Sequence, residues 1–319
     1  MPYTRYYRGQ MDDQERAAYD ALSEGVRNYQ EDISLPNFPP SSMTRVFRAV
    51  NLDYPEFFYA DLSRMQMSVG PFGPVAQISY VCSDSEARRL MDGIRRTADS
   101  IAAACQGKTP LEMEKLIHDE LVRGCRYGSL PERPRSAHSI RGALLDGICV
   151  CEGYAKAFKF LADQVKLESL VAVGMAAPPG KSEEGHAWNM IKFGRRVYHL
   201  DVTFDRLVCN QYHSMSYFNL SDKEVQYDHT PDSLFKMPAA PVSGALIPTM
   251  GGTRQLMDYL KDEATRGVSY SEVRLTKGFP HKELTRMIFD RLEKEDHWWY
   301  KRIRAYVYGN GEKSLFILW

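Results

Sequence analysis

The feature that most constrains the fold of this chain is an amphipathic stretch that begins at a cysteine. If a helix runs from 151 to 165, positions 151, 155, 158, 162 and 165 are Cys, Ala, Phe, Ala and Val. They form one apolar stripe at helical spacing, so the helix must bury this face, with Cys151 at its first turn. Strand-like runs follow at 168–176 and 186–204, the second with a hairpin pattern about Gly194 and Arg195. The pattern predicts an α+β core in which the helix packs on an antiparallel sheet.

Helix and strand signals continue on both sides of this core. Apolar spacing and N-capping residues predict helices at 11–29, 41–50 and 84–104 and a further helix that begins at 110. The alternation of 75–82 predicts a strand. Residues 231–248 contain four prolines and read as a linker. Beyond them we expect a helix at 253–266, a strand at 270–276, a helix at 281–294 and a hairpin over 304–319.

These elements predict four successive parts in a chain of 319 residues, a length that suits two or three compact units. Residues 1–65 form a helical lead-in segment, and 66–232 form the core that carries the chemistry. A Pro-rich linker, 233–248, joins this core to a small α+β domain, 249–319.

Composition excludes several classes of partner. Basic and acidic residues both number 41, so neither a nucleic-acid-binding surface nor a polybasic membrane anchor has its electrostatic driving force. No apolar run approaches the roughly 20 residues that a membrane span needs. The polar start is not a signal peptide, which predicts a cytoplasmic protein if Met1 is the native start and leaves a secreted one open if it is not. Six cysteines without a CxxC pair predict reduced thiols.

Three residue types in this core can perform thiol chemistry together. A helix N-terminus stabilises a thiolate, which favours Cys151 as a nucleophile. A two-residue loop at Gly194 and Arg195 pairs His186 with Thr203, which places Asp201 on the same face as His186. A loop shifted by one residue puts His186 and Asp201 directly opposite each other. Either register brings a carboxylate beside an imidazole, as a nucleophile–base–orienter set requires.

Neighbouring residues are candidates for supporting roles. Trp188 lies on the His186 face and is predicted to shield the site from water. Gly153 lets another element approach the sulfur. Tyr154 and Asn189 are predicted to support the site wall structurally. His229 is predicted to be a capping or loop residue.

The motifs resemble those of the transglutaminase-like branch of the papain-like cysteine enzymes, of the bacterial type. The matching words are Cys-Glu-Gly-Tyr-Ala at 151–155, His-Ala-Trp-Asn at 186–189 and Tyr-His-Leu-Asp-Val-Thr-Phe-Asp at 198–205. Weaker similarity extends from about 7 to 230 and leaves the last part of the chain without a matching motif. The resemblance implies a papain-like fold in which Cys151 is the nucleophile, His186 the general base and then acid, and Asp201 the orienter.

The resemblance implies acyl transfer from peptide or glutamine-type amides through a thioester, with no cofactor and with a peptide or protein as substrate. Hydrolysis, as in a cysteine protease or amidase, is favoured, because nothing in the sequence indicates an amine site. No calcium motif is present to support a calcium-switched cross-linker. Alternatives are a cross-linking transglutaminase, a non-catalytic scaffold that binds peptides or partners and, ranked low, a peptide N-glycanase. The sequence does not specify an oligomeric state.

A second thiol, Cys149, precedes the predicted nucleophile by two residues where the family ordinarily has a hydrophobic residue. A zinc site built from Cys149, Cys151, His186 and His199 is disfavoured, because structural zinc prefers cysteines separated by two to four residues. We therefore predict no metal. Cys149 is predicted to be a core residue, and a redox disulfide with Cys151 is the alternative.

Overall fold

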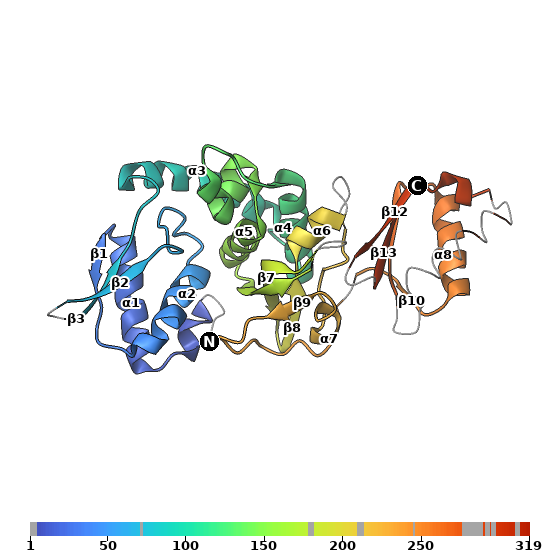
Figure 1. The fold of residues 1–319 in the computed structure, drawn as a ribbon. Helices are drawn as coiled ribbons and strands as arrows, with labels where there is room; N and C mark the ends of the chain where they lie inside the picture. The colour runs from blue at the N-terminus through green and yellow to red at the C-terminus, as the bar shows by residue number, and fades with distance from the viewer. Residues whose placement is uncertain are drawn as a thin grey trace. The chain divides into compact units, whose positions relative to one another are not determined.

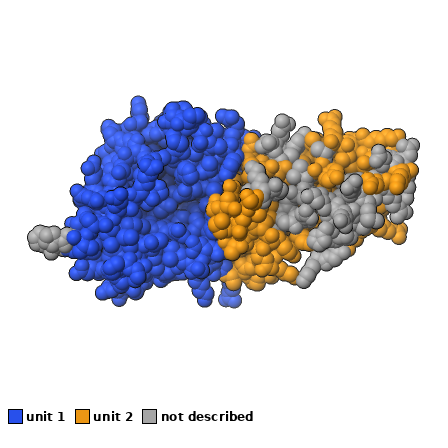
Figure 2. All heavy atoms as spheres, in the orientation of Figure 1, with its two compact units in different colours: residues 1–174, 186–195, 231–238 blue, residues 175–185, 196–230, 239–319 orange. Residues whose placement is uncertain are grey.

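The computed structural model describes residues 5–70, 73–177, 182–208, 214–244, 246–275, 290, 294, 298–309 and 313–319. Contacts divide the chain into two units, which Figure 2 colours separately. Unit 1 comprises Met1–Gly174, His186–Arg195 and Pro231–Pro238, and unit 2 comprises Met175–Gly185, Arg196–Thr230 and Ala239–Trp319. Both units therefore combine segments that are far apart in the sequence.

Unit 1 begins with two helices and a small sheet (Figure 1). The helices α1 (Asp13–Arg27) and α2 (Met43–Asp53) follow the short turns η2 (Arg8–Gln10) and η3 (Pro40–Ser42). The sheet has the antiparallel order β1-β3-β2, with β1 at Asp32–Ser34, β2 at Gln66–Gly70 and β3 at Gly73–Gln77. The predicted strand 75–82 is too long, since β3 ends at Gln77 and Tyr80 makes only an isolated bridge with Ala60. The two other strands are short and were not predicted.

Three helices of unit 1 form its centre: α3 (Asp84–Ala104), α4 (Pro110–Gly124) and α5 (Cys151–Gln164). The predicted helix starts are confirmed by their caps. The Ser83 side chain accepts the N–H of Glu86, and Thr109 and Glu112 form a capping box. Both α3 and α4 pack against α5. The single apolar stripe predicted for α5 understates its burial, because every residue from Gly153 to Ala162 is buried.

Short elements connect α4 to α5. These are β4 (Arg126–Tyr127), η4 (Pro134–His138), η5 (Gly142–Asp146) and β5 (Ile148–Cys149). Strands β4 and β5 pair in parallel, with Tyr127 opposite Cys149. Before β5 the chain turns at Gly147, which adopts a left-handed conformation with φ 67°.

A four-stranded sheet has the order β8-β7-β6-β9. Its strands are β6 (Glu168–Ala176), β7 (Glu184–Phe193), β8 (Arg196–Leu200) and β9 (His229–Pro231). The predicted strand at 168–176 and the turn at Gly194 and Arg195 are confirmed.

The predicted pairing of His186 with Thr203 is wrong. Strand β8 ends at Leu200, and the next residues form the helix α6 (Val202–Val208). The cause is local, since Asp201 Oδ1 accepts the N–H groups of Thr203 at 2.9 Å and Phe204 at 3.1 Å and so caps a helix where the sequence alternation favours a strand.

The C-terminal part of unit 2 is a helix on a sheet. Figure 1 shows α8 (Thr253–Arg266) on one face of a four-stranded sheet, whose strand order is β10-β11-β13-β12. These strands are β10 (Thr249–Met250), β11 (Tyr270–Leu275), β12 (Ala305–Gly309) and β13 (Ser314–Leu318), and the short α7 (Asp222–Val225) and η6 (Tyr300–Arg302) complete the unit. Leu256 and Leu260 of α8 pack with Val273, Leu315 and Ile317. The α+β prediction is confirmed for these elements, and the predicted helix 281–294 lies outside the described residues apart from 290 and 294.

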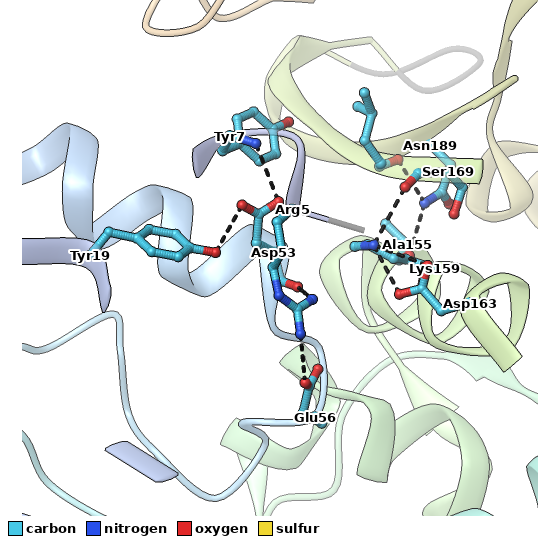
Figure 3. A network of polar contacts seen from close by, with 11 residues as sticks. Arg5, Tyr7, Tyr19, Asp53, Glu56, Ala155, Lys159, Asp163, Ser169 and Asn189 are labelled. Atoms are coloured by element: carbon cyan, nitrogen blue, oxygen red, sulfur yellow. Dashed lines mark hydrogen bonds and ion pairs between the residues drawn. The ribbon is translucent and has the colours of Figure 1, made fainter. Parts of the chain in front are cut away.

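Buried polar groups fasten the lead-in helices of unit 1 (Figure 3). The Asp53 carboxylate at the end of α2 accepts the N–H groups of Tyr7 at 3.4 Å and Arg8 at 3.1 Å and the hydroxyl of Tyr19 at 3.0 Å. Burial raises the pKa of Asp53 to about 6 against the opposing effect of these donors. No helix within the described ranges combines the length and the apolarity needed to cross a membrane.

Candidate active site

Cys151 is the first residue of α5. Its N-cap is Val150, whose side chain makes no capping hydrogen bond, so the N–H groups of the first turn have no side-chain cap. The Cys151 side chain is half-buried. A partly exposed thiol at a helix N-terminus lies beside backbone N–H groups that can bind an oxyanion.

Gly153 is needed because the chain before α5 packs closely on the first turn. A Cβ at this position would lie 2.4 Å from the Ala137 carbonyl oxygen and 2.6 Å from Cys149 Cβ. The same Ala137 carbonyl accepts the N–H of Val150 at 3.0 Å. Gly153 therefore allows η4 and β5 to pack against the start of α5. The approach of another element to the Cys151 sulfur stays a prediction.

Cys149 lies in the core. Its side chain is fully buried in β5, and its sulfur is 3.2 Å from the sulfur of Cys125. Burial raises the pKa of the Cys149 thiol, and the neighbouring Cys125 raises it further. A protonated, buried thiol is a packing residue, so the predicted core role of Cys149 is confirmed.

An ionic cluster that the sequence analysis missed lies one residue after Cys151. Glu152 accepts hydrogen bonds from Asn51 at 3.1 Å and pairs with Lys156 at 2.8 Å and with His138 at 3.1 Å. Burial raises the pKa of Glu152, but Lys156, His138 and Asn51 outweigh it and lower the pKa well below its usual value. Only Glu152 and Lys156, four residues apart on one helix face, were visible as a pair in the sequence.

A cavity of about 370 Å³ opens beside this cluster. Its wall combines Phe57, Phe58 and Asp61 of the lead-in segment with charged residues of η4 and α5, among them Arg135, Glu152 and Lys156. All of these residues belong to unit 1. The volume falls in the range of pockets that hold small molecules or side chains of a peptide.

His186 lies on β7 with Trp188. The side chain of His186 is 6% exposed, and its ring stacks on that of Trp188, with centroids 6.2 Å apart and planes inclined by 14°. Trp188 is itself buried. Residues two apart on a strand share a face, so the tryptophan covers the imidazole from one side, as a shielding role requires.

Asn189 ties β7 to α5 (Figure 3). Its amide nitrogen donates to the carbonyl oxygens of Ala155 at 2.9 Å and Leu170 at 3.2 Å. Ala155 lies one turn after Cys151, and Asn189 lies three residues after His186, so this bond joins the two segments that carry the predicted thiol and imidazole. Tyr154 has a similar supporting contact, since its hydroxyl donates to the Cys125 carbonyl at 2.6 Å.

Asp201 belongs to unit 2, where it follows β8 directly. While its Oδ1 caps α6, its Oδ2 lies 3.0 Å from Nε2 of His229. The prediction that His229 is a capping or loop residue is therefore wrong, since His229 is the first residue of β9 and is 2% exposed. No spacing pattern in the sequence indicates that His229 contacts Asp201, 28 positions earlier. The only sequence feature at His229 is the acidic residue directly before it, Asp228.

Asp205, the last residue of the third motif, has a structural role. Its Oδ1 accepts the Ser214 hydroxyl at 3.0 Å and the N–H of Tyr217 at 2.9 Å. It therefore holds the segment that follows α6. The second half of the motif organises the surroundings of Asp201 rather than adding a reactive group.

Comparison with known proteins gives a family match over the same region. Residues 95–202 match the transglutaminase-like superfamily. No curated protein matches the chain. This match includes Cys151, His186 and Asp201 and ends before the C-terminal part of the chain.

Several solved structures resemble the chain distantly. One is a "TGase", with 8% identity, a TM-score of 0.33 and coverage of 69% of this chain and 56% of that one. Another is a "putative cysteine protease" from Cytophaga hutchinsonii, with 12% identity, a TM-score of 0.28 and coverage of 44% and 61%. A "putative protease" from Parabacteroides distasonis has 9% identity, a TM-score of 0.25 and coverage of 66% and 40%. The chain thus spans less than two thirds of each of these three proteins. Residues 95–202, which combine helices and strands, are the part of this chain that is similar to the transglutaminase-like superfamily.

Proposed function

We propose that Cys151, His186 and Asp201 form a catalytic triad for thiol-dependent acyl transfer on peptide or glutamine-type amide bonds. Hydrolysis is the proposed outcome, so the protein acts as a cysteine protease or amidase on a peptide or protein substrate. Asp201 orients the imidazole of His186, and His186 moves the proton between sulfur, leaving group and water.

The reaction follows from these roles. The Cys151 thiolate attacks the amide carbonyl carbon and forms the C–S bond of a tetrahedral intermediate. The His186 imidazolium gives its proton to the amine nitrogen as the C–N bond breaks, which leaves a thioester. His186 then takes a proton from water, whose oxygen attacks the thioester carbon. The C–S bond breaks, the carboxylic acid leaves and the thiolate–imidazolium pair is restored.

The observation that carries the proposal is the link between the two segments of unit 1. Cys151 begins α5 with a half-exposed thiol, and Asn189 fastens β7, the strand of His186, to the next turn of that helix. Strand β8, which Asp201 follows directly, neighbours β7 in the sheet order. A scaffold that only binds partners has no physical need for a half-exposed thiol at an uncapped helix start.

The nearby cavity supports a peptide substrate. It is lined by Glu152, the residue next to Cys151, and it offers an aromatic wall and charged groups. Such a lining suits a peptide side chain better than a purely apolar ligand. Trp188 beside His186 limits the access of water to the imidazole.

A glutamine-containing peptide, incubated with and without dansylcadaverine, distinguishes the possible reactions. For hydrolysis we expect ammonia or peptide fragments without incorporation of the amine, whereas a transglutaminase incorporates it. The Cys151→Ser variant is the matched control and should lose all turnover. A casein digest analysed by mass spectrometry extends the assay to many peptide sequences. Product formation by Cys151→Ser at the wild-type rate contradicts the proposal.

A further inference from the structure

A chain of buried polar groups continues from Asp201 into the interior of unit 2. His229 lies between two carboxylates, with Nε2 3.0 Å from Asp201 Oδ2 and Nδ1 2.6 Å from Asp228 Oδ1. The other oxygen of Asp228 accepts the Tyr217 hydroxyl at 2.8 Å. The His229 ring packs on Phe204, with centroids 4.8 Å apart. Every polar atom of the imidazole is therefore directed at a carboxylate.

This geometry favours an imidazolium at His229. A neutral ring would turn one unprotonated nitrogen toward a carboxylate oxygen, which repels it, whereas an imidazolium donates to both. Burial lowers the pKa of His229, but the hydrogen bonds and charges of Asp201 and Asp228 outweigh burial and raise it. Tyr217 and His199 are titratable neighbours of His229 in unit 2. Burial lowers the pKa of His199 against the opposing effect of Asp222, and the charge of His229 lowers it further.

The two carboxylate oxygens of Asp201 accept hydrogen bonds from different groups. Oδ1 accepts two N–H groups at the start of α6, and Oδ2 accepts the N–H of His229. A carboxylate has about four acceptor positions, so these three bonds fix its plane without exhausting its capacity. The neighbouring cation also favours the ionised form of the carboxylate.

We propose that His229 is a positioning residue, which holds the Asp201 carboxylate ionised and in the orientation that the proposed triad requires. This inference rests on the proposed function, because it assigns Asp201 the task of orienting His186. It adds a second histidine to the site, one that acts through Asp201 and touches no substrate.

The pH dependence of Cys151 alkylation tests this role. His229→Gln keeps a neutral donor for Asp201 but removes the cation. Asp201 should then take up a proton more readily in acid and cease to support the imidazolium of His186. A plot of the rate of Cys151 alkylation by iodoacetamide against pH falls on its acid side, which is called the acid limb here. We expect the midpoint of this acid limb to rise by about one pH unit in His229→Gln.

His199→Gln is the matched control. His199 is equally buried in unit 2 and pairs with a different carboxylate, Asp222, at 2.9 Å. This substitution should leave the acid limb in place. An equal shift in both variants, or no shift in His229→Gln, overturns the positioning role while the wild-type profile still supports the triad.

Two further measurements separate the possible failures. If His229→Gln does not fold, Asp228→Asn retains the imidazole, removes one of its two carboxylates and should shift the limb in the same direction.

Histidine NMR of the wild type should show His229 still protonated above its ordinary pKa, and Asp201→Asn should lower that pKa. A wild-type alkylation profile that follows a free thiol contradicts the proposed function and the positioning role together. A neutral His229 at pH 6 contradicts the positioning role alone.

Discussion

Single residues determine how accurately the start of α5 is held. Gly153 lies against the Ala137 carbonyl and Cys149, and Glu152 is tied to three different partners. These contacts surround Cys151 without using its sulfur. They tie the first turn of α5, which carries the proposed nucleophile, to the segments packed against it.

Gly153→Ala should destabilise the protein by about 1–3 kcal/mol, because the added methyl group overlaps backbone that cannot move freely. The matched control is Gly124→Ala at the end of α4, where a Cβ meets nothing within 4 Å. That change should be neutral or stabilise by up to about 1 kcal/mol through helix propensity. Thermal unfolding followed by circular dichroism measures both. Equal stability of the two variants would show that the packing at Gly153 is looser than the structure indicates.

At this scale the sequence predicts residue types better than contacts. Cys151, His186 and Asp201 were identified because their motifs occur in order along the chain. The partner of Asp201 was missed, since His229 reaches it only through the fold. The sequence predicted a close approach to the Cys151 sulfur, whereas the groups that pack against Gly153 itself, Ala137 and Cys149, could be named only from the structure.

Elements of the fold are joined by a few buried hydrogen bonds. Asn189 is the clearest case, because its amide links β7 to α5 and to Leu170 of β6. Both accepting carbonyls belong to buried residues. The bond therefore couples the stability of the fold to the position of His186.

Asn189→Leu should cost about 2 kcal/mol or more, because it leaves two buried carbonyls without their donor. It should also slow alkylation of Cys151 at about pH 6, since β7 is no longer fastened to the helix. Thr109→Ala, which removes the α4 cap far from this bond, should cost about 1 kcal/mol without slowing alkylation. Denaturant unfolding and the alkylation rate are measured on the same samples. A stability loss in Asn189→Leu with unchanged alkylation would separate the bond from the site.

Element boundaries were predictable where a cap marks them. Ser83 and Thr109 gave the starts of α3 and α4, and α8 was predicted with its exact ends. Helix α6 was missed because its cap, Asp201, lies inside a run that alternates like a strand. Strands β1 and β2 were missed because three or five residues give too little periodicity.

Within unit 2, the C-terminal sheet is joined to the segment that follows α6. Glu272 of β11 accepts the N–H of Met215 at 2.7 Å and the hydroxyls of Ser214 at 2.8 Å and Ser216 at 2.5 Å. Burial, together with the charge of Asp205, raises the pKa of Glu272 to about 7. The Glu272 carboxyl, which links the C-terminal sheet to the segment after α6, therefore titrates near neutral pH.

The raised pKa of Glu272 predicts that the stability of the whole molecule depends on pH. Between an unfolded pKa of about 4.5 and a folded one near 7, only the native state keeps the proton on Glu272. The contribution of protonated Glu272 to the free energy of unfolding is therefore complete below about pH 4.5. It is lost as the pH rises through about 7, which lowers the free energy of unfolding by roughly 3 kcal/mol. Glu272→Gln should flatten the decline in melting temperature between pH 5 and 8. Glu132→Gln, in an exposed loop, should leave it unchanged, and an identical slope in wild type and Glu272→Gln would contradict the assignment.

The central claim is that Cys151 is activated by His186. Brief treatment with iodoacetamide at about pH 6, followed by intact mass and peptide mapping, tests it on the wild type and on His186→Ala. The account predicts one fast adduct, mapped to Cys151, that is lost in the variant, because a free thiol with a pKa near ~8.5 is mostly protonated at that pH. Uniformly slow labelling of all cysteines, or a fast adduct that survives His186→Ala, would contradict it.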